Sequence, residues 1–288
     1  MSDTDTPRRP GPWDPKPEEA AAAARAAPAA AERPSRAAEA PLDKGQSPVW
    51  AVISTLLLGG FIWVISGSWV IAVAAIWGLF VHEYGHVLAM NRLGMGPARI
   101  YIIPFLGGVA KSQRLPQSEW HGVLVSLAGP AFGLLAAIPF FAGFVITGHA
   151  AWLLGAGIIA LINLVNLAPA PPLDGSKALG PVLAGIHPML ERAAMIAVGL
   201  LVVWWGLTTG RFILAAFLAI ALIGHLKRGA WRPEGRPLTA RESLSSVGLF
   251  AATAAACAGV GVAAMMPLAD GSLPGALSVA GSYLGIGR

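Results

Sequence analysis

The sequence predicts an all-α polytopic membrane protein with about seven transmembrane helices and a short β-hairpin between the second and the third. Composition is the first indication: 55% of the residues are hydrophobic, only 12% are charged, and the mean hydropathy is +0.64. Soluble domains carry about 25% charged residues. The other indications are apolar runs close to the roughly 20 residues that cross a bilayer, and Lys and Arg gathered in alternate connecting segments.

The N-terminal 46 residues differ in composition from the rest of the chain. They are rich in Ala, Pro, Arg and Glu and contain almost no large aliphatic side chains. Such a segment buries too little apolar surface to offset the entropy lost on ordering, so we expect 1–46 to be a disordered cytoplasmic tail. We divide the remainder into a core at 47–190, additional transmembrane helices at 191–268 and a short C-terminal tail at 269–288.

Apolar segments after Pro48 are the predicted spans. They lie near residues 49–66, 69–92, 119–147, 151–169, 193–209, 212–227 and 244–267. Only residues 208–211 join the fifth to the sixth, and we interpret these two as a tight hairpin of spans rather than one distorted helix.

Charge gives the orientation of these spans. With the N-terminus inside, 18 of the 20 Lys and Arg residues lie on the inner side, and only Arg211 and Arg288 lie outside. This asymmetry is typical of bacterial inner-membrane proteins, and it accounts for the net charge of +5 without a nucleic-acid partner.

A metal-binding pattern, His82-Glu83-Tyr84-Gly85-His86, lies within the second predicted span. Residues four apart share one face of a helix, so His82 and His86 can bind the same ion, with Glu83 beside them as a general base. Ionisable groups at membrane depth are energetically costly and therefore indicate a functional site. We also expect Tyr84 and Asn163 to point into the apolar bundle and to form hydrogen bonds there.

A catalytic zinc ion needs a third protein ligand besides the two histidines. Cysteine-rich zinc sites are excluded because Cys257 is the only cysteine. Asp174 is the strongest candidate, because it ends a proline-rich segment just beyond the fourth span, although an ordinary Asp-Gly turn is an alternative. A different membrane zinc protease would use a downstream glutamate, Glu191 or Glu234.

HEYGH in one span, followed by NLAPAPPLDG at the end of a later one, resembles the site-2 protease family of intramembrane zinc metalloproteases. That family pairs H-E-x-x-H with N-x-x-P-x-x-x-L-D-G, which Asn166 to Gly175 fill here. The resemblance covers about 49–190. It implies that His82, His86 and Asp174 bind one zinc ion per chain and that Glu83 is the catalytic base.

Two further elements of the resemblance concern polar and substrate-binding groups. The family usually has Asn at the position of Gly133, so here Asn163 or Asn166 is a candidate for oxyanion or substrate binding. The family also has a second glycine after the aspartate, and Ser176 replaces it in this chain. Residues 99–111, with the pair Gly107-Gly108, predict the hairpin, and the resemblance implies that this hairpin is re-entrant. We interpret it either as a substrate-strand docking site or as a hydrophobic loop at the interface.

From these features we predict a zinc endopeptidase with its active site on the cytoplasmic side of the membrane. Its substrate would be a membrane protein cut in or near a transmembrane segment, with the lipid bilayer as the surrounding solvent. The alternative is a catalytically inactive membrane protein that retains the metal site for binding or sequestering a partner. A metal permease is disfavoured because the first, fifth and seventh spans contain almost no polar groups.

Overall fold

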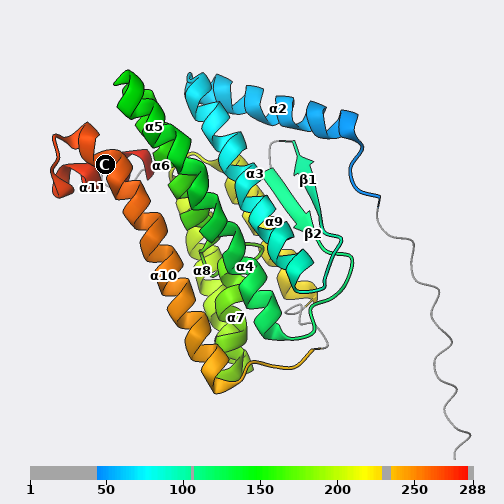
Figure 1. The fold of residues 1–288 in the computed structure, drawn as a ribbon. Coiled ribbons are helices and arrows are strands. Elements are labelled where there is room, and N and C mark those ends of the chain that lie inside the picture. Colours follow the sequence, from blue (N-terminus) through cyan, green and yellow to red (C-terminus); the bar gives the residue numbers. More distant parts are fainter. Residues whose placement is uncertain (1–43, 105–106, 229–234, 285–288) are drawn as a thin grey trace, which may run out of the picture. The chain divides into compact units, whose positions relative to one another are not determined.

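The computed structural model describes residues 44–104, 107–228 and 235–284. Residues 1–43 of the predicted N-terminal tail lie outside the described residues. The described part is mostly helical, with one small antiparallel sheet (Figure 1). The elements follow the order α2 (Pro48–Ser66), α3 (Trp69–Arg92), β1 (Arg99–Ile103), β2 (Gly107–Lys111), α4 (Glu119–Gly133), η1 (Leu134–Ala137), α5 (Ile138–Thr147), α6 (Ala150–Asn166), α7 (Asp174–Ile186), α8 (Pro188–Thr208), α9 (Phe212–Arg228), α10 (Ala240–Met265), η2 (Met266–Ala269) and α11 (Leu273–Leu284).

Helix α3 packs against α2, α4, α6 and the sheet. The Ser68 side chain caps its first turn by accepting from the Ile71 N–H, and Arg92 lies in its last turn, where a cation is favourable. Helices α4 and α6 both pack along α3. At the contact with α4, a side chain at Gly85 would collide with the Ala128 carbonyl, so this glycine allows the two helices to approach closely.

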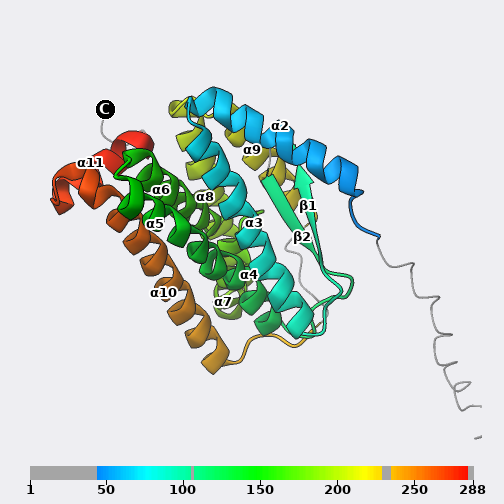
Figure 2. The same ribbon diagram turned by 45° about the horizontal axis from the view of Figure 1, so that its top comes forward.

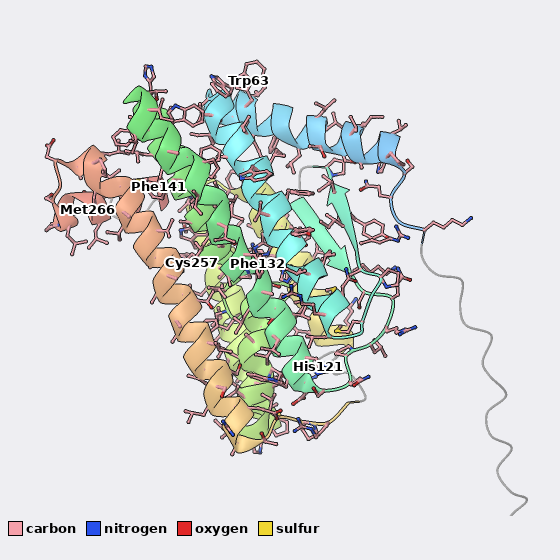
Figure 3. The ribbon with its side chains drawn as sticks, viewed as in Figure 1. Trp63, His121, Phe132, Phe141, Cys257 and Met266 are labelled. Carbon is pink, nitrogen blue, oxygen red and sulfur yellow. The ribbon has the colours of Figure 1, made fainter. Side chains whose placement is uncertain are left out.

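Two apolar clusters hold the bundle together on either side of its middle. One joins α3, η1, α5, α6 and the end of α10 around Phe140 and Ile159. The other joins α4, α7 and α10 around Val123, Leu127 and Cys257. Figure 3 shows Phe141 and Met266 toward one end of the bundle and His121 toward the other, with Cys257 between them.

The predicted hairpin is a two-stranded antiparallel sheet that follows α3 in the chain and packs against it. Tyr101 pairs with Val109 and Ile102 with Gly108. Helix α2 contacts α3 and β1, and it runs at a steep angle to α3 in both ribbon views (Figures 1 and 2). Whether the hairpin re-enters the membrane stays a prediction.

Five elements of the described residues are long and apolar enough to cross a membrane: Pro48–Ser66, Trp69–Arg92, Glu119–Thr147, Pro188–Thr208 and Ala240–Ala269. The predicted fourth and sixth spans correspond to shorter apolar helices, Ala150–Asn166 and Ala215–Gly224. At 1.5 Å per residue, the 17-residue helix α6 is about 25 Å long, less than a 30 Å hydrocarbon core. The total of seven spans therefore stays a prediction.

The C-terminal third agrees with the sequence-based prediction in one respect and differs from it in another. Residues 188–228 form two helices, α8 and α9, rather than one distorted element. Helix α10 packs against α4, α6 and α7, so it completes the bundle that holds the site. The predicted tail contains a further helix, α11, which the Gly-rich sequence did not indicate.

Candidate metal centre

Helices α3 and α7 bring together the three residues that the sequence proposed as metal ligands. His82 and His86 lie one turn apart on α3, and Asp174 is the first residue of α7. All three are buried, with relative exposures of 2%, 6% and 6%. In the described part of the chain they form the only cluster of three or more potential ligands, so Glu191 does not join them and Glu234 lies outside the described residues.

Asp174 reaches this place because the chain reverses direction after α6. Helix α6 ends at Asn166, a seven-residue segment of turns follows, and α7 begins at Asp174. The start of α7 packs closely against the segment that follows α6. A side chain at Gly175 would collide there with the Leu167 carbonyl, so this position requires glycine.

The potential ligand atoms form a nearly equilateral triangle. His82 Nε2 lies 3.1 Å from Asp174 Oδ2 and 3.1 Å from His86 Nε2, and His86 Nε2 lies 3.2 Å from Asp174 Oδ2. Four ligands at zinc's usual 2.0–2.1 Å would be separated by about 3.3 Å in a tetrahedron. The triangle therefore fits three corners of a zinc site and leaves the fourth for water.

Hydrogen bonds behind the two imidazoles fix the direction of their lone pairs. His86 Nδ1 lies 2.7 Å from the Val125 carbonyl, which can only accept, so Nδ1 carries the proton. His82 Nδ1 lies 2.9 Å from Asn163 Oδ1, while Asn163 Nδ2 donates to the Ile159 carbonyl at 2.7 Å. If the amide were turned over, its oxygen would face the Ile159 carbonyl oxygen, and both atoms can only accept. Asn163 Oδ1 therefore faces His82, and His82 Nδ1 carries the proton that it donates.

Each Nε2 atom therefore presents a lone pair to the other and to the Asp174 carboxylate. Three acceptors at 3.1–3.2 Å repel one another unless a cation lies among them. Imidazole nitrogen together with carboxylate oxygen is a donor set that zinc prefers. The residues present thus fit a zinc ion by both spacing and chemistry.

Glu83 is buried beside the cluster, and its side chain faces the hairpin. Its relative exposure is 6%, and a Cβ atom at Gly108 of β2 would lie 2.7 Å from Glu83 Cγ and 3.3 Å from Oε1. A glycine at this point of β2 therefore leaves the space that the carboxylate uses. Tyr84, in contrast, is 49% exposed, so the prediction that it points into the bundle is wrong.

Gln46 occupies one edge of the hairpin, and no described strand pairs with the other, which we call the open edge. Gln46 Oε1 accepts from the Ile102 N–H at 2.8 Å, and Gln46 Nε2 donates to the Ile102 carbonyl at 2.9 Å, so the main-chain groups of Ile102 face away from β2. In an antiparallel pair the partner's groups then also face outward. Gly108 is that partner, and no described strand pairs with its edge.

The two candidate amides have different environments. Asn163 is fully buried and uses both ends of its amide, as described above, which confirms its predicted place in the bundle. Asn166 donates to the Ile162 carbonyl at 2.9 Å and is less buried. The sequence predicted that Asn163 forms hydrogen bonds inside the bundle, but it did not indicate His82 as the partner.

Comparison with known proteins relates part of the chain to a peptidase family. Residues 70–150 match peptidase family M50, a range that includes His82, Glu83 and His86 and ends before Asp174. A Synechocystis protein named "Putative zinc metalloprotease sll0528" is 29% identical over 150 residues. That match covers 49% of this chain and 38% of the relative, so the chain spans about two fifths of the relative's length. These matches confirm the predicted resemblance to the site-2 protease family, peptidase family M50, over part of the chain.

Proposed function

We propose that the chain is an intramembrane zinc endopeptidase that hydrolyses a peptide bond in or near a transmembrane segment of a membrane protein. The observation that carries this proposal is the convergence of His82 Nε2, His86 Nε2 and Asp174 Oδ2 at tetrahedral spacing, with the buried carboxylate of Glu83 beside them. The match to a peptidase family and the apolar helices support it.

The residues divide the chemistry between them. One zinc ion per chain, bound by His82, His86 and Asp174, would act as a Lewis acid on the scissile carbonyl and bring the pKa of a bound water toward about 7. Glu83 accepts a proton from the attacking water at a carboxylate oxygen and later donates one to the leaving amine nitrogen. The protons on the Nδ1 atoms keep both imidazoles oriented throughout.

Substrate binding is assigned to the open edge of β2. A transmembrane helix conceals its peptide bonds within its own hydrogen bonds, so the cleaved segment must first unwind. The outward-facing main-chain groups of Gly108 offer such a segment new partners by strand addition, directly beside Glu83. The neighbouring Gly107 belongs to the same proposed docking site.

We place the protein in a bacterial inner membrane, with the active site on the cytoplasmic side. The basic residues that flank α3 and the hairpin support this orientation: Arg92, Arg99, Lys111 and Arg114. Water then reaches the metal centre from the cytoplasm by a short path. Labelling of single introduced cysteines in the loops tests the orientation, because only loops on the outer side react with an impermeant reagent in intact cells.

The proposal is tested with the purified full chain and a single-span membrane protein as substrate. We expect cleavage within or beside the span, loss of cleavage when a chelator removes zinc, and recovery when about one zinc ion per chain is restored. Equal cleavage with and without chelator would contradict a zinc mechanism. Binding of zinc and of the substrate without cleavage would favour the alternative of an inactive sequestering protein.

A test of the hairpin's role follows from its contact with Glu83. Gly108→Ala places a methyl group against the Glu83 side chain, and we expect cleavage to fall about 100-fold while zinc remains bound, because a small displacement of a catalytic group has such an effect. Val109→Ala is the matched control, since Val109 is 46% exposed on the other face of the strand. Similar losses in both variants would show that the strand as a whole, rather than this contact, matters.

A further inference from the structure

Asn163 has a position that neither the metal-binding motif nor the peptidase match explains. It lies on α6, outside the matched residues 70–150, and its side chain is completely buried in an otherwise apolar bundle. A buried amide is unfavourable unless its polar atoms are paired. Here one end is paired within α6 and the other reaches across to His82 on α3.

We propose that Asn163 is the positioning residue of the metal centre: it holds His82 in the Nδ1-protonated form and directs its Nε2 lone pair at the metal. The proposal rests on the proposed zinc site, but it concerns a residue of α6 that is not a ligand. Because Nδ2 is anchored 2.7 Å from the Ile159 carbonyl, Oδ1 must face the imidazole. A hydrogen-bond partner behind a metal-binding histidine fixes both its tautomer and its ring orientation.

A second observation shows that the structure is arranged around this amide. The three heavy atoms nearest to a Cβ atom built at Gly133 all belong to Asn163, and the closest is Oδ1, the atom that accepts from His82. Any side chain at position 133 of α4 would therefore displace the amide. Gly133 and Asn163 thus form a pair in which one residue leaves the space that the other fills.

This assignment differs from an oxyanion or substrate-binding role for Asn163. Such a role requires an N–H group directed at the substrate, whereas the Asn163 side chain is fully buried, with Nδ2 turned toward the Ile159 carbonyl and Oδ1 toward His82. The two roles predict different measurements. A positioning residue changes the affinity for zinc in the absence of any substrate, while an oxyanion donor lowers kcat at saturating zinc and leaves zinc affinity unchanged.

The experiment is a double-mutant cycle read by competition for zinc with a chromophoric chelator, using the purified full chain. We expect Asn163→Ala to weaken zinc binding about 10- to 100-fold, and Gly133→Ala to weaken it by a similar factor because the new methyl group displaces the amide. In the Asn163→Ala background, Gly133→Ala should change the affinity less than about twofold, because the methyl group then has room.

Asn166→Ala is the matched control for zinc affinity. Like Asn163, Asn166 donates to the carbonyl four residues earlier on α6, but the structure shows no bond from it to a ligand histidine. Asn163→Leu, which preserves the shape of the side chain, replaces Asn163→Ala if the smaller residue destabilises the fold. Zinc affinity within about threefold of the unsubstituted chain for both Asn163 variants, or fully additive effects of the two alanine substitutions, would overturn the proposal. Neither result would by itself contradict zinc-dependent cleavage.

Discussion

Glu83→Gln should lower the rate of cleavage by about 10² to 10⁴ while the protein keeps its zinc. The amide has nearly the same size and shape as the carboxylate, but it cannot accept a proton from water, and removal of a general base has effects of this magnitude. The zinc content should not change because Glu83 is outside the triangle formed by His82, His86 and Asp174. Cleavage of a single-span substrate and the zinc content of the same preparation measure both effects.

Glu191→Gln is the control for this experiment. Glu191 is also a buried glutamate, with 8% relative exposure, but it lies on α8 against Gly180 of α7 and away from the three ligands. We expect its zinc content to equal that of the unsubstituted chain. Loss of zinc in Glu191→Gln would instead support the alternative metalloprotease in which a downstream glutamate is the third ligand.

Gly129→Ala should weaken zinc binding about 100-fold. Gly129 of α4 lies directly against the His86 ring, and the atom nearest to an added Cβ is the ligand atom Nε2 itself. The imidazole must rotate or α4 must move, and either change displaces Nε2 from the triangle, with the loss of affinity expected for a disturbed metal ligand. Competition with a chelator measures the change.

The same helix provides the control for this second substitution. A Cβ atom at Gly122 would contact nothing within 4 Å, and alanine has the higher helix propensity. Gly122→Ala should therefore leave zinc affinity unchanged and should not destabilise the helix. Normal zinc binding by Gly129→Ala would mean that α4 is not held against His86 as the structure shows.

The parts of the site that follow from local spacing could be predicted from the sequence. Two histidines four residues apart share a helix face. The prolines before Asp174 indicated where the helix would end and which carboxylate could be the third ligand. The same geometry also places Tyr84 on the exposed side of α3, which the prediction for this residue overlooked. Tyr84 is two residues, or about 200°, from His82 around the helix, so it faces away when the histidines face inward.

The groups behind the ligands could not be predicted, because they depend on how the helices rotate against one another. Helices α3 and α6 are apolar nearly all round, so the sequence pattern does not indicate which side of α6 meets His82. The bond from His82 to Asn163, the Val125 carbonyl behind His86 and the fit of Asn163 beside Gly133 are all contacts between separate helices.

Helix α7 shows a different limitation of the sequence. The prolines around residues 169–172 indicated an extended segment, and Asp174 had an ordinary turn as its alternative interpretation. In the structure Asp174 opens a 13-residue helix, where an acidic residue is favourable and where its carboxylate meets α3. The division between a core and additional helices stays a prediction, although α10 packs against three helices of that core.

X-ray absorption at the zinc edge of the purified, zinc-loaded chain tests the central claim most directly. We predict one zinc ion per chain with two imidazole nitrogens at about 2.0–2.1 Å, carboxylate and water oxygens completing four-coordination, and one oxygen lost in Asp174→Ala. Coordination that includes a sulfur at about 2.3 Å, or a spectrum unchanged in both His86→Ala and Asp174→Ala, would contradict the assignment of these residues as the zinc ligands.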